Sequence, residues 1–339
     1  KRHGLTPKAR ITGMATAALA AGNTVVMKPA EQSSVIGATF ANVLNDAGFP
    51  AGVVNFLPGD GEVVGAALVE HPDVSVIAFT GSRQVGVHIY ETAAKLLTGQ
   101  TSLKRVIAEM GGKNAIIIDD DADLDEAAEG VLASAFCYAG QKCSACSRAI
   151  VLKSVKSAFV EKLVDAARSI RIGPATTPDT LVGPLVDEDS RSKTMSYIER
   201  GKAESKLVFQ ADLAGLETQG TFAPPTIFAD VPPEASIAQE EIFGPVVAVI
   251  DADDFEHAIT IANSTDYALT GGVYSRSPAN IDLARQRFNV GNLYINQKIT
   301  GALVDRQPFG GFKMSGVGSK AGGPDYLKQF MDPKSITEN

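Results

Sequence analysis

The chain has three cysteines, Cys137, Cys143 and Cys146, which stand within ten positions in the stretch FCYAGQKCSACSR (136–148). Crowded thiols can form a disulfide, a metal site, a redox pair or a catalytic nucleophile. Zinc requires four ligands, whereas the C-x2-C pair supplies two and the four histidines are scattered along the chain. A thioredoxin-like pair would lie at a strand-to-helix turn near the start of a small domain, whereas this pair follows a long helix-like stretch. We therefore predict no metal site and favour a nucleophile.

Cys143 has the surroundings expected of that nucleophile. It follows a polar Gly-Gln-Lys turn with available backbone N–H groups, and Lys142 and Arg148 are expected to favour its thiolate. The thiolate is the form of cysteine that attacks carbonyl carbons. Cys137 and Cys146 are expected to pack as small apolar side chains, which is the common fate of free cysteines.

Composition limits the class of protein. The net charge of −8 argues against a nucleic-acid partner, because phosphate-binding surfaces need an excess of Lys and Arg. No apolar run approaches the roughly 18 residues of a membrane span, and the sequence opens without a signal peptide. The odd number of cysteines fits a reducing compartment. The sequence thus predicts a cytoplasmic enzyme with no membrane span.

Apolar runs of strand length alternate with segments of helix length. Up to about residue 110, the patterns predict strands at 23–29, 52–59 and 74–82 and helices at 11–22, 33–50, 61–72 and 85–97. Beyond it they predict strands near 114–118, 149–152, 245–250 and 271–274 and helices near 123–138, 154–170, 187–204, 253–263 and 279–287. This alternation predicts an α/β fold with parallel sheets covered on both faces. The glycine-rich stretch 307–330 is predicted to be an ordered loop.

Five motifs carry a resemblance to a known family. GQKCSACSR, EMGGKN, AFTGS, EEIFGPV and QPFGG, in their order and separations, resemble the aldehyde dehydrogenase superfamily. Within it, GQKCSACSR, NLYINQKITGALVDRQPFGG and SGVGSKAGGPDYL are similar to the L-glutamate γ-semialdehyde (Δ1-pyrroline-5-carboxylate) dehydrogenases. The resemblance implies a Rossmann-type NAD-binding domain over 1–110, a catalytic domain over 111–313 and a C-terminal segment, 314–339, that returns toward the cofactor or oligomerisation region. The glycine pair of EMGGKN (109–114) suits a hinge at the boundary.

The resemblance also implies a catalytic pair. Cys143 would attack the aldehyde to give a thiohemiacetal, hydride would pass to NAD+, and water would release the carboxylate from a thioester. Glu109 matches the family's glutamate, which acts as the base for that hydrolysis. Read without the resemblance, Glu109 is more simply a hinge carboxylate that caps a turn.

The expected cofactor is NAD, although the fingerprint G-x-G-x-x-G is absent and GDGEVVG (59–65) is only a near miss. The resemblance implies that Lys28 and Glu31 meet the adenosine ribose, where an acidic residue favours NAD over NADP. It implies that Gly81 and Ser82 hold the pyrophosphate at a helix N-terminus.

The resemblance places two further residues at the nicotinamide end of the cofactor. Glu241 would hold the nicotinamide ribose and Phe243 would pack beside the ring. Without the resemblance, this stretch is simply a turn before a strand.

The expected substrate site includes Ser144, the residue after the nucleophile, and the loop that contains Gly301 and Ala302. In the similar dehydrogenases these positions grip the α-carboxylate, for which a hydroxyl and backbone N–H groups are suitable donors. The alternative is a glycine-containing bend with no ligand. Phe136 and Phe309 could flank the aliphatic chain of the substrate.

The predicted function is therefore NAD-dependent oxidation of L-glutamate γ-semialdehyde to L-glutamate, the second step of proline catabolism. The alternatives are a dehydrogenase of another semialdehyde or aliphatic aldehyde, or an inactive nucleotide-binding fragment. The expected partners are the small aldehyde and further copies of the chain, in a homodimer or larger homo-oligomer, with a fused or associated proline dehydrogenase as a further possibility.

Residues 1–10 depart from the family. Relatives carry a PWN or PFN motif before the helix expected to begin near Ile11, and its asparagine joins the oxyanion hole, whereas KRHGLTPKAR contains no asparagine. Losing one of two oxyanion donors costs about 10²–10³ in rate. The expectation is that residues 1–339 alone are nearly inactive compared with a chain extended upstream.

Overall fold

The computed structural model describes residues 14–303 and 306–339. The oxyanion asparagine expected upstream of Ile11 concerns positions outside these residues. The chain forms two compact units. Unit 1 takes the described parts of Lys1–Ala108, Leu303–Phe309 and Val317–Asn339, and unit 2 takes Glu109–Ala302 and Gly310–Gly316. No helix of the described residues is long and apolar enough to cross a membrane.

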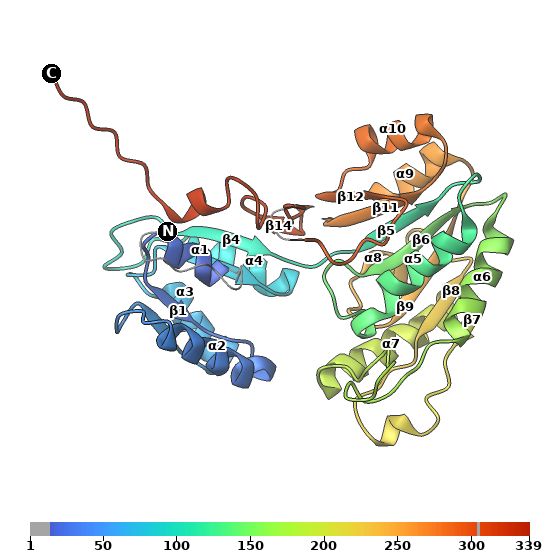
Figure 1. The fold of residues 1–339 in the computed structure, drawn as a ribbon, viewed down its shortest axis with the longest axis horizontal. Coiled ribbons are helices and arrows are strands. Elements are labelled where there is room, and N and C mark those ends of the chain that lie inside the picture. Colours follow the sequence, from blue (N-terminus) through green and yellow to red (C-terminus); the bar gives the residue numbers. More distant parts are fainter. Residues whose placement is uncertain (1–13, 304–305) are drawn as a thin grey trace. The chain divides into compact units, whose positions relative to one another are not determined.

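Unit 1 alternates short strands with helices (Figure 1). Its helices are α1 (Met14–Ala20), α2 (Ser34–Asp46), α3 (Ala66–Glu70) and α4 (Arg83–Ala93). Its strands are β1 (Val25–Met27), β2 (Val54–Phe56), β3 (Val76–Thr80) and β4 (Arg105–Glu109), whose last residue opens unit 2. β1 pairs in parallel with β2, and β3 and β4 form a second sheet with β14 (Gly316–Val317). The strands predicted at 23–29, 52–59 and 74–82 are confirmed, and so are the helices predicted at 33–50, 61–72 and 85–97. Strand β4 was not expected.

The core of unit 1 joins residues from both ends of the sequence. Ile107 on β4 packs with Tyr326 and Phe330 of the C-terminal segment, and alanines of α1 surround them. The Arg105 guanidinium adds an ion pair with Asp332, 2.8 Å apart. The stretch 307–330 is mostly loop, as predicted, and is interrupted by β13 (Phe312–Lys313), β14 and a single 3₁₀ turn.

Unit 2 is built on a seven-stranded sheet in the order β12-β11-β5-β6-β9-β8-β7. All neighbours are parallel except β7 and β8. The strands are β5 (Asn114–Ile118), β6 (Cys146–Leu152), β7 (Lys206–Gln210), β8 (Thr226–Ala229), β9 (Val246–Ala252), β11 (Thr270–Tyr274) and β12 (Asn292–Ile295), while β10 (Tyr267–Ala268) pairs with β13 outside this sheet. The helices are α5 (Leu124–Phe136), α6 (Lys156–Arg168), α7 (Glu188–Glu204), α8 (Ser236–Gln239), α9 (Phe255–Asn263) and α10 (Pro278–Arg287).

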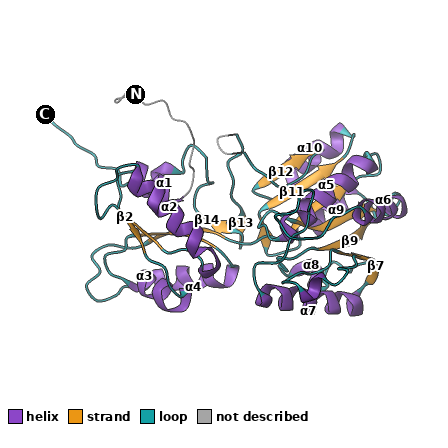
Figure 2. Cartoon of the chain, turned by 60° about the horizontal axis from the view of Figure 1, so that its bottom comes forward, coloured by secondary structure: helices purple, strands orange, loops and turns teal. Residues whose placement is uncertain are grey.

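The sheet of unit 2 separates two buried layers (Figures 1 and 2). On β5, Ile116 and Ile118 face a core shared with α5 and α6, while Ala115 and Ile117 face a core shared with α7, α8, α9 and α10. This division follows from the two-residue period of a strand. Because both faces are buried, the central strands are apolar throughout, which confirms the predicted α/β fold.

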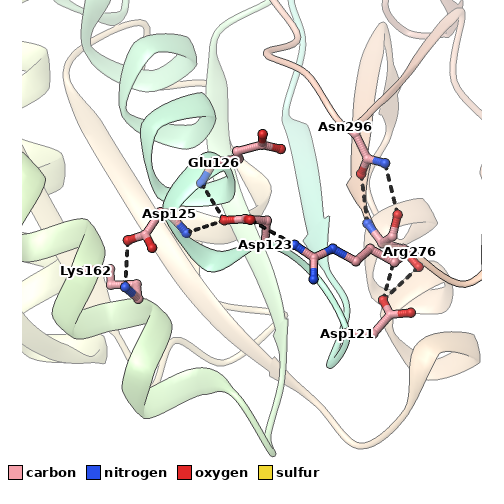
Figure 3. Close-up of polar contacts among 8 residues, drawn as sticks. Asp121, Asp123, Asp125, Glu126, Lys162, Arg276 and Asn296 are labelled. Atoms are coloured by element: carbon pink, nitrogen blue, oxygen red, sulfur yellow. Dashed lines mark hydrogen bonds and ion pairs between the residues drawn. The ribbon is translucent and has the colours of Figure 1, made fainter.

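Hydrogen bonds close the carboxyl edge of this sheet, where the chain leaves β5 and β11. Asp121 accepts a hydrogen bond from the Arg276 backbone N–H at 2.8 Å, and the Arg276 guanidinium pairs with Asp123 at 2.9 Å (Figure 3). Asp123 also caps α5 by accepting from two backbone N–H groups. Asp119, Asp120 and Asp121 are the acidic group of the described chain that is close enough to share a cation. Hydrogen bonds within the protein already engage Asp119 and Asp121. These two aspartates therefore have a structural role at this edge that needs no metal ion.

Candidate active site

The predicted catalytic residues Glu109 and Cys143, and the predicted ribose-binding residue Glu241, lie at the opposite, amino edge of the sheet of unit 2. Glu109 lies just before β5, Cys143 just before β6 and Glu241 shortly before β9. Ligands of open α/β sheets usually bind at the carboxyl ends of the strands. In this unit the loops that precede β5, β6 and β9 supply the reactive groups instead. The backbone N–H groups at the start of these strands therefore lie near the reactive side chains.

An unusual turn carries the chain from α5 to Cys143. Tyr138, Ala139 and Gly140 all have left-handed backbone angles, with φ of 58°, 53° and 68°. Two of the three are not glycine, and such residues are uncommon in this conformation. A Cβ on Gly140 would stand 2.4 Å from the carbonyl oxygen of Gly244, so only glycine fits where the turn crosses that backbone.

The Cys143 thiol is mostly buried, and its pKa is raised to about 11. Burial is the largest cause, and the carboxylates of Glu109 and Glu241 add to it because a nearby negative charge disfavours a thiolate. Hydrogen bonds from the backbone N–H groups of Ser144 and Cys143 act in the opposite direction. Cys143 is therefore a protonated thiol at neutral pH in this state of the protein.

The expectation that Lys142 and Arg148 favour the thiolate is wrong. The ammonium of Lys142 lies over the Tyr138 ring, 4.5 Å from its centroid. Arg148 is 2% exposed, and its guanidinium donates to three carbonyl oxygens, those of Lys113 at 3.0 Å, Ile261 at 2.9 Å and Ala262 at 2.8 Å. The side chains of a strand alternate between its faces, so closeness in sequence gave no information on where Arg148 points.

The other two thiols do not resemble Cys143. Cys146 is 1% exposed, packs in the core beneath α5, and burial raises its pKa to about 12. Packing of Cys146 is therefore confirmed. Cys137 is half-buried at the end of α5. The three thiols are free, and the acidic group described above contains none of them.

Glu241 is fixed by the glycine pair that follows Glu109. Its Oε1 accepts a hydrogen bond from the Gly112 N–H at 3.0 Å, and a Cβ on Gly111 would stand 2.1 Å from its Oε2. Burial raises the pKa of Glu241, while the Gly112 hydrogen bond and the charges of two lysines oppose that effect. The glycine pair thus makes room for a carboxylate. Phe243, with φ of 60°, leaves its ring 41% exposed.

Lys113 stands next to these groups and was not singled out from the sequence. Its side chain is 2% exposed, and its Nζ has no hydrogen-bond partner. Burial lowers its pKa to about 7, with the Arg148 charge as a second cause, while the carboxylate of Glu241 opposes the shift. Lys113 directly precedes the apolar strand β5, and a lysine at such a position is the signal that could have marked it in the sequence.

In unit 1, Lys28 and Glu31 form one cluster with a residue that was not predicted. The Lys28 ammonium pairs with Glu31 Oε1 at 2.7 Å, and the Gly61 N–H donates to the same oxygen at 2.6 Å. These contacts, with Lys28 the largest cause, lower the pKa of Glu31 to about 2. Gly61 belongs to the near-miss motif GDGEVVG, so that stretch lies against the predicted ribose-binding carboxylate.

Gly81 and Ser82 lead into α4 of the same unit. The Ser82 hydroxyl accepts a hydrogen bond from the Val85 N–H at 3.3 Å and caps the helix. A Cβ on Gly81 would stand 2.4 Å from the Phe79 ring. The turn is thus the capped start of an 11-residue helix, and helix N-termini favour negative charge.

The predicted substrate residues are placed less uniformly. Ser144 is 7% exposed beside Cys143, and Gly301 is exposed with φ of 87°, followed by the half-buried Ala302. Phe136 is fully buried in the core of unit 2, and Phe309 is half-buried in unit 1. A ring with no exposed surface contacts no ligand in this conformation, so the role given to Phe136 stays a prediction.

A cysteine before a buried strand and a glutamate before the adjacent strand, on an α/β unit, form the arrangement expected of the thiol-dependent dehydrogenases that the motifs resemble. The chain belongs to the aldehyde dehydrogenase family, whose model matches residues 6–336.

The chain is 53% identical over 332 residues to a 1-pyrroline-5-carboxylate dehydrogenase of Geobacillus thermodenitrificans, and 52% identical to that of Bacillus subtilis. Each match covers 98% of this chain and 64% of the relative, so the chain spans less than two thirds of their length.

Solved structures give the same likeness. Proline utilization A of Bdellovibrio bacteriovorus is 58% identical with a TM-score of 0.94, covering 96% of this chain and 34% of that protein. A 1-pyrroline-5-carboxylate dehydrogenase from Thermus with bound NAD is 52% identical with a TM-score of 0.92, covering 94% of this chain and 61% of that one. These likenesses confirm the resemblance seen in the motifs.

The raised pKa of Cys143 predicts a slow thiol in the ligand-free protein. Its alkylation by iodoacetamide should accelerate about tenfold per pH unit from pH 7 to 10, because the thiolate fraction grows toward a pKa of about 11. Trypsin cleaves after Lys142 and Arg148 and leaves Cys143 and Cys146 together in the peptide CSACSR, so tandem mass spectrometry of that peptide assigns the alkylated cysteine, while Cys137 lies in a separate peptide. A rate that levels off below pH 8 would contradict this electrostatic description.

Proposed function

We propose that the protein containing this chain oxidises L-glutamate γ-semialdehyde to L-glutamate with NAD+. The observation that carries the proposal is the position of Cys143 within the electrostatic reach of two carboxylates, Glu109 and Glu241, in a chain of the aldehyde dehydrogenase family. Relatives named 1-pyrroline-5-carboxylate dehydrogenase, about half identical over nearly the whole chain, support this substrate over other aldehydes.

Cys143 is the proposed nucleophile. Its sulfur attacks the carbonyl carbon, the carbonyl electron pair moves to oxygen, and the thiol proton leaves. Because the pKa of this thiol is about 11, the proton needs an acceptor, and Glu109 and Glu241 are the carboxylates that act on it. The N–H groups of Cys143 and Ser144 face the sulfur and stabilise negative charge there.

Glu109 is the proposed base for the second half of the reaction. Once the carbon has been oxidised it is a thioester of Cys143, and a water molecule must add to it while losing a proton. Glu109 takes that proton, the C–S bond breaks, and the sulfur leaves as a thiolate. Glu109 is half-buried at the end of β4, and its carboxylate acts electrostatically on the Cys143 thiol.

The residues of unit 1 fit the adenosine half of NAD. Glu31 is 51% exposed in its side chain and ionised above about pH 2, so its oxygens can accept hydrogen bonds from ribose hydroxyls. Such a carboxylate would repel the 2′-phosphate of NADP. The capped start of α4 at Gly81 and Ser82 suits the pyrophosphate. When bound, NAD+ would accept the hydride that leaves the substrate carbon.

Glu241 is proposed to hold the nicotinamide ribose, and Phe243 to pack beside the ring. The Gly112 N–H already fixes one oxygen of Glu241, which orients the carboxylate. Ser144 and the loop at Gly301 and Ala302 are proposed to bind the substrate α-carboxylate, with Phe309 along its aliphatic chain. Phe136 is fully buried in this conformation, so its proposed contact with that chain requires the side chain to leave the core.

The wider assembly is also a proposal. The likeness to one third of a Bdellovibrio proline utilization A chain supports a fused or associated proline dehydrogenase. We propose that the intact protein is a homodimer or a larger homo-oligomer.

A panel of aldehydes tests the substrate. The intact protein should give its highest kcat/KM, measured as NADH formation, with glutamate semialdehyde. Succinate semialdehyde and acetaldehyde should be at least about tenfold poorer, since they lack the α-amino acid group. Equal or better turnover of either would reject the proposed substrate while leaving the family intact.

Replacing the nucleophile tests the mechanism. Cys143→Ser should reduce kcat at least about a thousandfold, because a hydroxyl forms and leaves a covalent adduct far less readily than a thiol. Cys137→Ala should retain most of the turnover. Cys146→Ser, buried behind the loop, serves as the control for stability, and an equal loss of turnover in a folded Cys146 variant would point to a dithiol mechanism.

The Glu109→Gln variant tests deacylation. If Glu109 takes the proton from water, the thioester should accumulate, and stopped-flow absorbance should show a burst of NADH close to one per site, then turnover reduced about 10²–10⁴-fold. Glu126→Gln, on the solvent side of α5, is the matched control. Unchanged steady-state turnover in Glu109→Gln would remove this residue from the mechanism.

A further inference from the structure

Asn114, the first residue of β5, joins three parts of unit 2 through its side chain. Its Nδ2 donates to the carbonyl oxygen of Cys143 at 2.7 Å and to that of Ala145 at 2.8 Å. Its Oδ1 accepts the backbone N–H of Thr270, at the start of β11, at 3.0 Å. The residue is 3% exposed, so water does not compete for these bonds. Both amide hydrogens are used on the nucleophile loop.

The loop needs these donors because it lies outside the ladder of the sheet. Strand β6 begins only at Cys146, which pairs with Asn114, so the residues from Cys143 to Ala145 have no strand partners. The carbonyl between the two that Asn114 holds, that of Ser144, accepts the Thr270 hydroxyl at 3.3 Å. Three consecutive carbonyls are therefore satisfied by two side chains, as buried backbone groups require.

Holding the Cys143 carbonyl also fixes the direction of the next N–H. In a trans peptide, the C=O of one residue and the N–H of the next point in opposite directions. Because the Cys143 carbonyl is turned toward Asn114, the Ser144 N–H is turned the other way. Its effect on Cys143 is to lower the pKa of the thiol, against the effect of burial.

We propose that Asn114 is a positioning residue for the nucleophile: its amide holds the 143–144 peptide so that the Ser144 N–H faces the sulfur of Cys143. This inference rests on the proposed function only in treating Cys143 as the reactive group. It assigns a role to a residue that touches neither aldehyde nor cofactor in the mechanism above.

The charges around the thiol make this N–H important. The charged groups that act on Cys143 are Glu109, before β5, and Glu241, before β9, and both disfavour the thiolate. Lys142 beside it is turned over the Tyr138 ring. Backbone N–H groups are thus the interactions that favour negative charge on the sulfur, and one of the two depends on the peptide that Asn114 orients.

The test is the rate of Cys143 alkylation by iodoacetamide in the intact protein, without aldehyde or NAD+, between pH 8 and 11. In Asn114→Ala the rate at a given pH should fall roughly ten- to hundredfold, the size expected for losing one hydrogen bond to a charged group. Because the thiolate fraction still rises throughout this pH range, the loss should appear as a downward displacement of the whole rate profile. NAD affinity, measured by calorimetry, should change less than about twofold, because Lys28 and Glu31 are untouched.

Asn296 offers a matched control. It follows β12, at the opposite edge of the sheet, and its amide likewise donates to a carbonyl and accepts an N–H, both of Ser275 at 3.0 Å (Figure 3). Asn296→Ala should lower the melting temperature but leave the alkylation profile of Cys143 at the wild-type rate. If Asn114→Ala does not fold, Asn114→Ser, which keeps a hydroxyl donor, should show a smaller fall in rate.

The outcomes separate cleanly. A folded Asn114 variant with a wild-type alkylation profile would overturn the inference and reduce Asn114 to a structural clamp. An equal fall in Asn296→Ala would overturn it too, because the effect would then come from lost stability. If the wild-type protein oxidises no aldehyde, the proposed function fails, whereas a fall confined to Asn114 variants would still support the inference.

Discussion

The buried guanidinium of Arg148 is the contact on which the geometry of the site most depends. Taking a cation out of water costs several kcal/mol, and only well-placed acceptors offset that cost. Arg148 finds them in the carbonyls of Ile261 and Ala262, in the last turn of α9, and in the carbonyl of Lys113. Carbonyls at the end of a helix have no partner within it and favour a cation. One side chain thereby ties β6 to α9 and to the loop that follows Glu109.

That tie explains why two loops far apart in sequence can form one site. β6 begins directly after the Cys143 loop, and the Lys113 carbonyl belongs to the loop that leads from Glu109 into β5. Asn114 then links the same two loops a second time, through the Cys143 carbonyl. Gly112 completes the arrangement by donating to Glu241. Nucleophile and carboxylates are thus held by backbone contacts of a rigid sheet rather than by a mobile segment.

Local patterns in the sequence predicted most of the elements of unit 2 and the place of Cys143. Helices α5, α7, α9 and α10 begin after a residue whose side chain caps the first turn, which is a signal of short range. Strands β4, β7, β8 and β12 were among those missed, because a short apolar run fits a strand, a helix or a loop about equally well. The direction of Arg148 and the role of Asn114 could not be predicted, because their partners lie up to 156 residues away.

The residues that form the core of unit 1 are synthesised at widely separated times, because they lie far apart in the sequence. Ile107 leaves the exit tunnel with the first third of the chain, but its partners Tyr326 and Phe330 are made more than two hundred residues later. At about 5–20 residues per second, that interval lasts roughly 10–45 seconds. During it, Ile107 has only the earlier residues of this core, such as the alanines of α1, to pack against, while all the strands of the large sheet of unit 2 emerge in sequence. Unit 2 therefore has all of its sheet strands available before this part of unit 1 can close.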